Sequence, residues 1–234
     1  MNKIFSNLRG IGIFFTSKST DFTKEIVSPE DAIMSALSVL KTDRLTLQLL
    51  YTWLKKNAEL IHAESLQKKI DSETNPTHLA FLASLLTASK DRRLVTVASK
   101  IKFSKKTVND EVAKTLRLAA QFGQVDYDPI FLKFGLKISQ LQEEDEKKFI
   151  PKKYFIQDNP FLFCRALFGT NWRADVAAVL SIRDFNPTEI SNVLGCSYET
   201  AHRNYQSLKA AGWPKIEMNR LEVQPFRSLL MMSP

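Results

Sequence analysis

The stretch from residue 186 to residue 213, NPTEISNVLGCSYETAHRNYQSLKAAGW, contains two helix starts and two helix stops. Asn186, followed by a proline and then by Glu189, has the pattern of a capping box at a helix start. Gly195 permits the positive φ at which a helix can end, and Ser197 can cap the next helix. Because only about three residues connect the two helices, they must cross at a large angle, as in a helix-turn-helix.

The two predicted helices have separate apolar and polar sides. The apolar positions expected to face inward are Ile190, Val193 and Leu194 in the first helix, and Ala201, Tyr205 and Leu208 in the second, before Gly212 ends it. The opposite side of the second helix carries only groups able to form hydrogen bonds: Tyr198, Glu199, His202, Arg203, Gln206 and Lys209. A plain helical hairpin with a solvated outer face would have the same two sides.

The polar side of the helix over 198–211 suits the major groove of duplex DNA. In a recognition helix the N-terminal residues reach base edges, while hydroxyls and helix N-termini bind phosphates. Arg203 can pair with guanine and Gln206 with adenine, each contributing about 1–3 kcal/mol of discrimination.

The flanking sequence extends the pair of helices to a winged helix. RADVAAVLSI, residues 173–182, predicts a preceding helix, and WPKIEMNRLEVQPF, residues 213–226, predicts two short strands around a turn near Asn219 and Arg220. Three helices followed by a β-hairpin form a winged helix, which we expect over residues 161–234.

LGCSYETAHRNYQSLKAAGW resembles the recognition segment of bacterial ArsR- and MarR-type winged-helix transcriptional regulators. The resemblance covers 170–226 and implies phosphate contacts by threonines, base contacts from the start of the second helix, and backbone contacts by wing cations. Tyr205 is bulkier than the leucine usual at its place, and Glu217 and Glu222 weaken the wing's attraction to phosphate. The candidate DNA-binding residues are Thr188, Ser197, Tyr198, Thr200, His202, Arg203, Gln206, Lys215 and Arg220.

The rest of the chain is expected to be an N-terminal arm or strand pair over 1–27, a helical domain over 28–142 and a linker over 143–160. Cap and periodicity signals in the helical domain predict helices at 29–40, 43–59, 62–70, 76–88 and 108–120. The β-branched residues at 95–97 suit a strand as well as a helix, which leaves a degenerate second winged helix open. The linker carries a block of acids, a block of bases and a proline. The fold class is therefore mainly α, with a short β-hairpin wing at the C-terminus.

Composition supports a regulator and argues against an enzyme. The net charge of +8 favours a polyanionic partner, although it also serves solubility. Neither Cys164 nor Cys196 has metal-ligand neighbours, the three histidines are far apart, and no glycine-rich phosphate loop occurs, so we expect no metal and no cofactor. Cys196 is a redox sensor or simply a small turn residue. The apolar run IGIFF near the N-terminus is shorter than a signal-peptide core, and no apolar run approaches the length of a spanning helix, so we expect a cytoplasmic protein away from membranes.

The expected function is a sequence-specific transcriptional regulator, of the repressor type, that binds double-stranded DNA as a homodimer. The helical domain would serve dimerisation or a protein partner. Leu49, Trp53, Phe81 and Leu85 either face a second subunit or lie in the core. FCRALFGTNWRADVAAVL bears a weaker resemblance to winged-helix proteins encoded beside nucleotidyltransferases and phage-defence modules. The alternative function is therefore a protein-interaction module, such as an antitoxin or defence-system adaptor.

Overall fold

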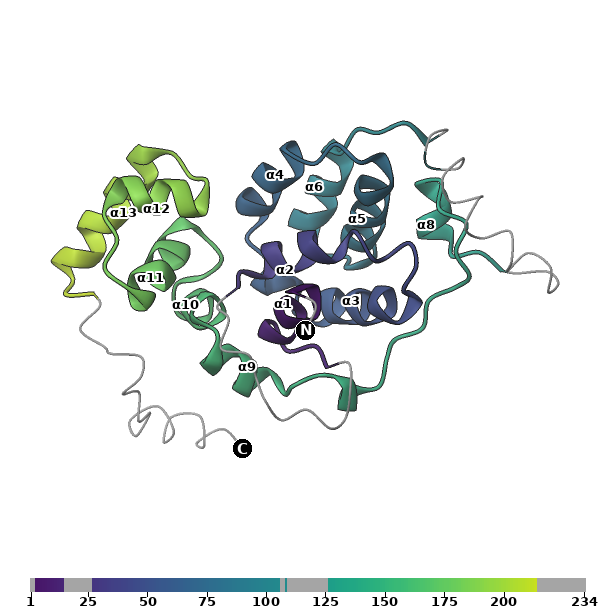
Figure 1. Ribbon diagram of the computed structural model, residues 1–234, viewed down its shortest axis with the longest axis horizontal. Helices are drawn as coiled ribbons and strands as arrows, with labels where there is room; N and C mark the ends of the chain where they lie inside the picture. The colour runs from purple at the N-terminus through teal and green to yellow at the C-terminus, as the bar shows by residue number, and fades with distance from the viewer. Residues whose placement is uncertain (1–2, 15–26, 106–107, 109–125, 214–234) are drawn as a thin grey trace. The chain divides into compact units, whose positions relative to one another are not determined.

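The computed structural model describes residues 3–14, 27–105, 108 and 126–213, and in these ranges the chain is mainly helical (Figure 1). It divides into two compact units, Met1–Leu162 (unit 1) and Phe163–Pro234 (unit 2). The described residues form no strand, only isolated bridges between Ile13 and Phe149 and between Tyr127 and Ser139. The mainly α prediction is confirmed, whereas the expected β-hairpin wing falls on residues outside the described ranges.

Unit 1 is built from short helices whose starts are fixed by capping side chains. Its helices are α1 Lys3–Gly10, α2 Pro29–Ala36, α3 Arg44–Asn57, α4 Ala63–Asp71, α5 Pro76–Ala88, α6 Arg92–Lys100, α8 Pro129–Lys133 and α9 Lys152–Asp158. Short 3-10 turns follow at Ala58–Leu60 and Glu146–Lys148. The residue before α2, α3, α5, α6 and α8 accepts a hydrogen bond from a backbone N–H of the first turn. Proline stands at the start of α2, α5 and α8, where a missing N–H costs nothing.

Helix α5 is the centre of the unit 1 core. It is buried nearly all round and contacts α3, α6 and α8. Leu49, Trp53, Phe81 and Leu85 are exposed by 0%, 1%, 4% and 0% respectively, so they are core residues. The option that they face a second subunit is wrong, because these side chains already pack against their own unit.

The N-terminal residues belong to the core, contrary to the expected arm or strand pair. Residues 3–10 form α1, which packs against α2, and Leu8, Ile11 and Ile13 are fully buried. The indole N–H of Trp53 donates to the carbonyl oxygen of Ile11 at 2.7 Å. The sequence did not predict this because the contacts that hold the segment come from residues far along the chain.

The segment over 143–160 also differs from the expected linker, because it packs on unit 1. The backbone N–H of Ile150 donates to the carbonyl oxygen of Gly12 at 2.9 Å. The Asn159 amide donates to the carbonyl oxygens of Gly10 and Val27, each at 2.9 Å. Gly12 has φ +92°, and a Cβ there would lie 2.6 Å from the Phe155 ring. The segment over 143–160 therefore packs against the N-terminal residues of unit 1.

Residues 95–97 lie inside helix α6, which corrects the strand alternative and with it the degenerate winged helix. Asp91 caps α6, and Leu94, Val97 and Ala98 form a buried stripe at three- and four-residue spacing. The free energy gained by burying that stripe is larger than the free energy that the β-branched residues cost in a helix. The helix expected at 108–120 falls outside the described ranges apart from Val108, which is buried.

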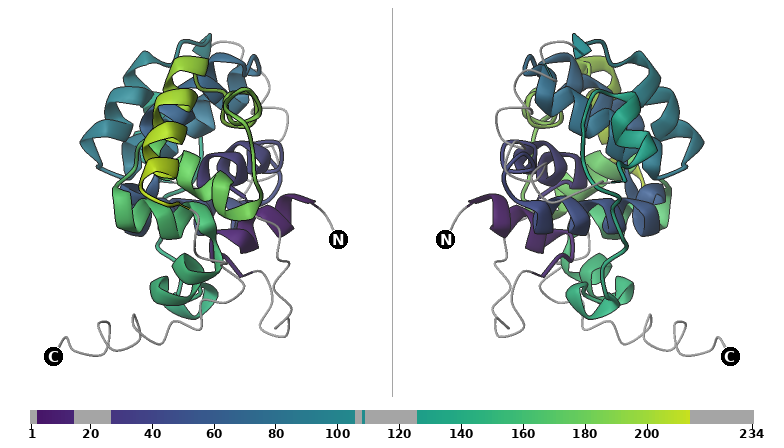
Figure 2. Two further views of the ribbon diagram at one scale, coloured as in Figure 1. Left: turned by 90° about the vertical axis from the view of Figure 1, so that its left-hand side faces the viewer. Right: turned by 90° about the vertical axis from the view of Figure 1, so that its right-hand side faces the viewer.

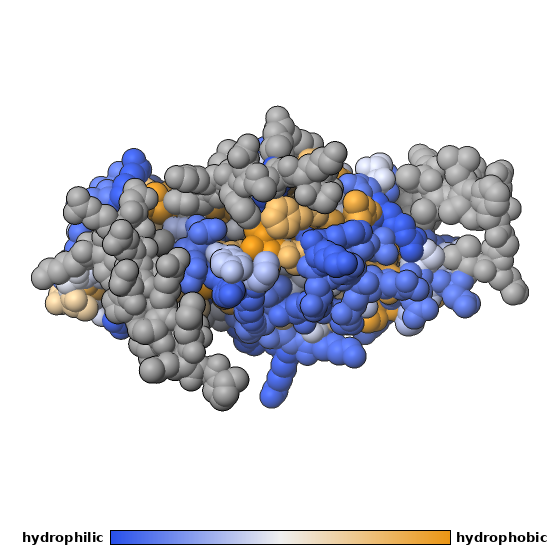
Figure 3. Space-filling model, turned by 90° about the horizontal axis from the view of Figure 1, so that it is seen from below, coloured by the Kyte–Doolittle hydropathy of each residue, from blue (hydrophilic) through white to orange (hydrophobic). Residues whose placement is uncertain are grey.

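On the face seen in Figure 3 the described residues are largely hydrophilic, with an apolar area near the centre of the view. None of the helices in the described ranges combines the length and apolarity needed to cross a bilayer.

The turn before α5 contains a carboxylate that should stabilise the fold in a pH-dependent way. Glu73 accepts the backbone N–H groups of Thr74 at 2.9 Å and Asn75 at 2.8 Å, and lies 3.1 Å from Nδ1 of His78. Partial burial raises the pKa of Glu73, but the hydrogen bonds from Asn75, His78 and Thr74 and the charge interaction with His78 together outweigh burial and hold the pKa below its usual value.

A depressed carboxyl pKa gives stability that is present above the unfolded-state value and lost as pH falls through the folded-state value. Glu73→Gln is therefore expected to lower the free energy of unfolding by about 1 kcal/mol at pH 7. The difference from wild type should shrink as pH falls below 4.5. Urea denaturation at a series of pH values measures this, with Asp126→Asn, an exposed site in the same unit, as the control. A difference that is constant with pH would contradict the assignment.

Candidate nucleic-acid interface

The helix-turn-helix predicted from the sequence is present in unit 2. Its helices are α10 Pro160–Phe168, which crosses the division between the units, α11 Trp172–Ile182, α12 Pro187–Leu194 and α13 Tyr198–Ala210. In the left view of Figure 2, α13 runs up the page while α12 is seen nearly end-on. The ends of α11, α12 and α13 agree with the predicted ones to within one or two residues.

The capping chemistry at the turn is as expected. Asn186 and Glu189 form the reciprocal capping box, with Asn186 Oδ1 accepting the Glu189 N–H at 3.0 Å. Gly195 ends α12 with φ +67°, and Ser197 Oγ accepts the Thr200 N–H at 3.2 Å. An added Cβ at Gly195 would meet nothing within 4 Å, so glycine is needed there for its backbone angle and not for space.

A side chain from α12 also braces the turn, which the sequence did not predict. The Ser191 hydroxyl donates to the carbonyl oxygen of Cys196 at 2.7 Å, across the connection between the two helices. Cys196 itself is only 6% exposed. Burial of the thiol limits access by an oxidant, which favours the turn-residue interpretation of Cys196 over redox sensing.

The inward side of the two helices is mostly as predicted. Ile190, Ala201 and Leu208 are 0%, 0% and 1% exposed. Tyr205 is half-buried, and Leu194 is likewise partly covered. Val193 was expected inside, but it is 55% exposed, because the buried direction of this short helix lies along Ile190 and Leu194.

Trp213 fixes the C-terminal end of α13. Its backbone N–H donates to the carbonyl oxygen of Leu208 at 2.8 Å, and Gly212 has φ +79°, as in a Schellman motif. Its indole N–H donates to the carbonyl oxygen of Ala177 at 3.0 Å, and its ring meets Phe168 edge-on at 5.5 Å. Helix α13 is thus held at both ends.

The polar side of α13 is open at its N-terminal half. Glu199, His202, Arg203 and Gln206 are exposed, and Tyr198 is 55% exposed. The rings of Tyr198 and His202 stack with centroids 5.7 Å apart. Arg203 makes no ion pair with any residue in the described ranges. This exposed surface, Tyr198, Glu199, His202, Arg203 and Gln206, is termed the α13 polar face.

Two of the expected contact residues have hydroxyls that are partly engaged within the protein. The Ser197 hydroxyl donates to Thr200 Oγ1 at 2.9 Å in addition to its capping role. The Ser197 O–H is thereby engaged as a donor, so Ser197 suits capping better than phosphate binding, whereas Thr200 only accepts in this bond and keeps its own O–H as a donor. Thr188 is exposed in the first turn of α12. Lys215 and Arg220 lie outside the described residues.

Lys209, expected on the same side of the helix, braces the fold instead. Its ammonium lies 2.8 Å from Oδ1 of Asp184, in the loop before α12, and 5.5 Å from the ring centroid of Tyr205. The hydrogen bond to Asp184 raises the pKa of Lys209. The sequence missed a nearby cation, Arg183, whose exposed guanidinium lies 4.0 Å from the Phe185 ring centroid. No local pattern distinguishes that arginine from other surface arginines.

A buried ion pair lies inside unit 2. Arg165 Nε of α10 donates to Asp175 Oδ1 of α11 at 2.8 Å, and their side chains are 0% and 1% exposed. Burial raises the pKa of the neighbouring Cys164 thiol to about 12. Removing either partner would leave the other charge buried and unpaired, which strongly destabilises a fold.

Among the described residues there is no group of three or more His, Cys, Asp or Glu side chains that could hold a metal ion. Comparison of the chain with protein-family models, with curated proteins and with solved structures finds no match in any of the three.

Proposed function

We propose that the chain is a sequence-specific, double-stranded DNA-binding regulator that reads the major groove with helix α13. The observation that carries the proposal is the α13 polar face. Its side chains are exposed and able to form hydrogen bonds, on a helix fixed at both ends by Ser197 and Trp213. A helix of this kind fits a major groove about 12 Å wide.

The chemistry of these side chains separates residues suited to contact bases from residues suited to contact phosphates. Arg203 and Gln206 offer donor and acceptor patterns that match guanine and adenine edges. Thr188, in the first turn of α12, and Arg183 before it suit contacts to the phosphate backbone, as does the net charge of +8. Because one such helix covers few base pairs, we propose binding as a homodimer to two half-sites about 34–36 Å apart.

Arg203→Ala is expected to relax specificity at one base pair by about 10- to 100-fold. The duplex to use is the one selected by the full chain from a random pool. Affinity for this duplex and for its single-base variants is then measured at several salt concentrations. Arg173→Ala removes the same charge from an exposed position on α11 and serves as the matched control. If both variants weaken binding to every duplex equally, Arg203 does not read a base.

A protein-interaction module is the second candidate function. Val193 and Tyr198, both 55% exposed, flank the turn of the helix-turn-helix and offer apolar area that a protein partner could cover. A gel shift of random duplex DNA at rising salt separates the two candidates. DNA binding predicts a steep loss of affinity with salt, whereas the absence of a shift at low salt favours the protein partner.

A further inference from the structure

Two aromatic rings stack on each other on the exposed side of α13. The ring centroids of Tyr198 and His202 lie 5.7 Å apart, and the ring planes are inclined by 24°. The two residues are four apart in the chain, so their side chains lie one turn apart on the same side of the helix. Gln206 comes four residues later, and its Nε2 lies 3.5 Å from Nε2 of His202. Tyr198, His202 and Gln206 therefore form one row along the exposed side of α13.

The Tyr198 ring is an exposed apolar surface at the start of this row. Tyr198 is the first residue of α13 and is 55% exposed. Because the ring stacks on His202, it is restricted to few rotamers, and a contact with DNA would cost little side-chain entropy. The N-terminal residues of a recognition helix are those that reach base edges. An ordered apolar ring at this place calls for an apolar group on the DNA.

The major groove displays one kind of apolar group at its base edges, the C5-methyl group of thymine. The other groups at these edges are hydrogen-bond donors and acceptors, which Arg203 and Gln206 can match. Gln206 suits adenine, and an adenine in a duplex is always opposite a thymine. The row thus offers an amide for the adenine and a ring for the thymine methyl group.

We propose that the ring pair of Tyr198 and His202 contacts the C5-methyl group of a thymine in each half-site. The inference rests on the proposed DNA binding by α13, and it names the base that this end of the helix selects. The contacting group is the Tyr198 ring and not its hydroxyl, because the methyl group gains by leaving water for an apolar surface and forms no hydrogen bond.

The test replaces thymine by deoxyuridine, one position at a time, in the duplex that the full chain selects from a random pool. Uracil lacks only the methyl group and keeps the base pair. The wild type is expected to lose about fourfold in affinity at one thymine of each half-site, the effect of leaving one methyl group in water. Tyr198→Phe keeps the ring and should show the same loss. Tyr198→Ala should bind the thymine and uracil duplexes equally.

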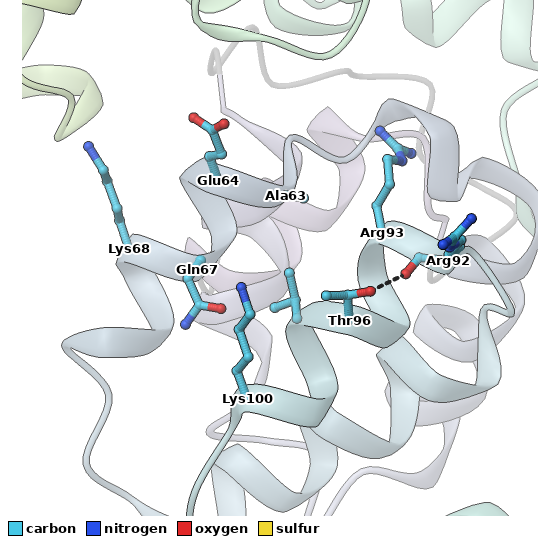
Figure 4. Close-up of a pocket in the computed structure, with 9 residues that line it drawn as sticks. Ala63, Glu64, Gln67, Lys68, Arg92, Arg93, Thr96 and Lys100 are labelled. Atoms are coloured by element: carbon cyan, nitrogen blue, oxygen red, sulfur yellow. Dashed lines mark hydrogen bonds between the residues drawn. The ribbon is translucent and has the colours of Figure 1, made fainter.

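Two control variants change residues of unit 1. Tyr154→Ala removes a tyrosine that is 49% exposed on α9 and should keep the difference between thymine and uracil. Lys100→Ala removes a cation beside a groove of roughly 550 Å³ between α4 and α6, around which the head groups of Lys68, Arg92 and Lys100 lie apart from one another (Figure 4). A general effect of charge would weaken this variant equally on the thymine and uracil duplexes.

Three results would overturn the inference and leave DNA binding by α13 intact, with circular dichroism used to check that each variant is folded. The first is a selected half-site without thymine. The second is equal affinity of the wild type for the thymine duplex and every uracil duplex. The third is a loss at uracil that persists in Tyr198→Ala, because another side chain then contacts the methyl group. If the chain selects no duplex at all, the proposed function fails as well, so the two failures are distinguishable.

Discussion

Arg165→Leu is expected to unfold unit 2 while unit 1 stays folded. The substitution leaves the Asp175 carboxylate, 1% exposed, buried without the guanidinium that now contacts it at 2.8 Å. Breaking a buried ion pair on one side costs about 3–5 kcal/mol, which is a large fraction of the stability of a small domain. Hydrogen exchange followed by mass spectrometry should show loss of protection in α11, α12, α13 and the part of α10 that belongs to unit 2, and unchanged protection in unit 1.

The matched control is Arg173→Leu, which removes an arginine from an exposed position on α11 of the same unit and is expected to leave hydrogen exchange almost unchanged. The double variant Arg165→Met with Asp175→Leu should recover most of the lost stability, because it removes both charges. If the double variant is as unstable as Arg165→Leu, the loss comes from packing and not from an unpaired charge. The DNA binding that we propose for α13 should be lost together with the protection of unit 2 from hydrogen exchange.

Trp53→Ala is expected to have a similarly large effect on unit 1. The side chain is 1% exposed, and its indole N–H donates to the carbonyl oxygen of Ile11, so it ties α3 to the segment after α1. Truncation creates a cavity and leaves that carbonyl unpaired, at a cost of about 3–5 kcal/mol. Urea denaturation followed by circular dichroism measures the loss.

Trp53→Phe separates the two contributions, because it keeps an aromatic ring and removes only the donor and part of the volume. We expect a loss of about 1–3 kcal/mol for this variant. Hydrogen exchange of this variant is the second measurement. The exchange rate in α1 should rise more than the rate in α5 if the hydrogen bond to Ile11 holds the N-terminal helix in place. Equal changes in both helices would show that cavity formation dominates.

The sequence predicted those elements whose causes are local. Asn75, Asn186 and Ser197 cap the helices that follow them, and each bonds a backbone N–H two or three residues on. Gly195 stops α12 through its own backbone angle. Such signals lie within a few residues of one another and need no knowledge of the fold.

The errors concern residues whose partners are distant in the chain. Helix α1 and the segment over 143–160 were expected as an arm and a linker, but they pack against each other and against α3. Residues 95–97 have strand-favouring side chains, yet the stripe around Val97 places them in a helix. In each case burial against a remote surface outweighs local preference.

The candidate interface was predicted in its outline and not in its detail. Tyr198, His202, Arg203 and Gln206 are exposed together, as helical spacing requires. Spacing alone did not indicate that Lys209 pairs with Asp184, that Ser197 and Thr200 bond to each other, or that Val193 faces outward. The groove beside α6 was missed because its walls come from two helices whose pairing the sequence does not specify.

The closure of unit 1 by its last residues has a consequence for synthesis on the ribosome. Gly10 and Gly12 bond to Asn159 and Ile150, so these contacts form only after nearly the whole unit has left the exit tunnel. Contacts between such distant residues carry a large loop-closure entropy and form late. Until then the carbonyl oxygens of Gly10 and Gly12 lack these partners, and a nascent chain stalled before residue 150 would hold its N-terminal segment only through contacts such as those of α1 with α2 and of Ile11 with Trp53.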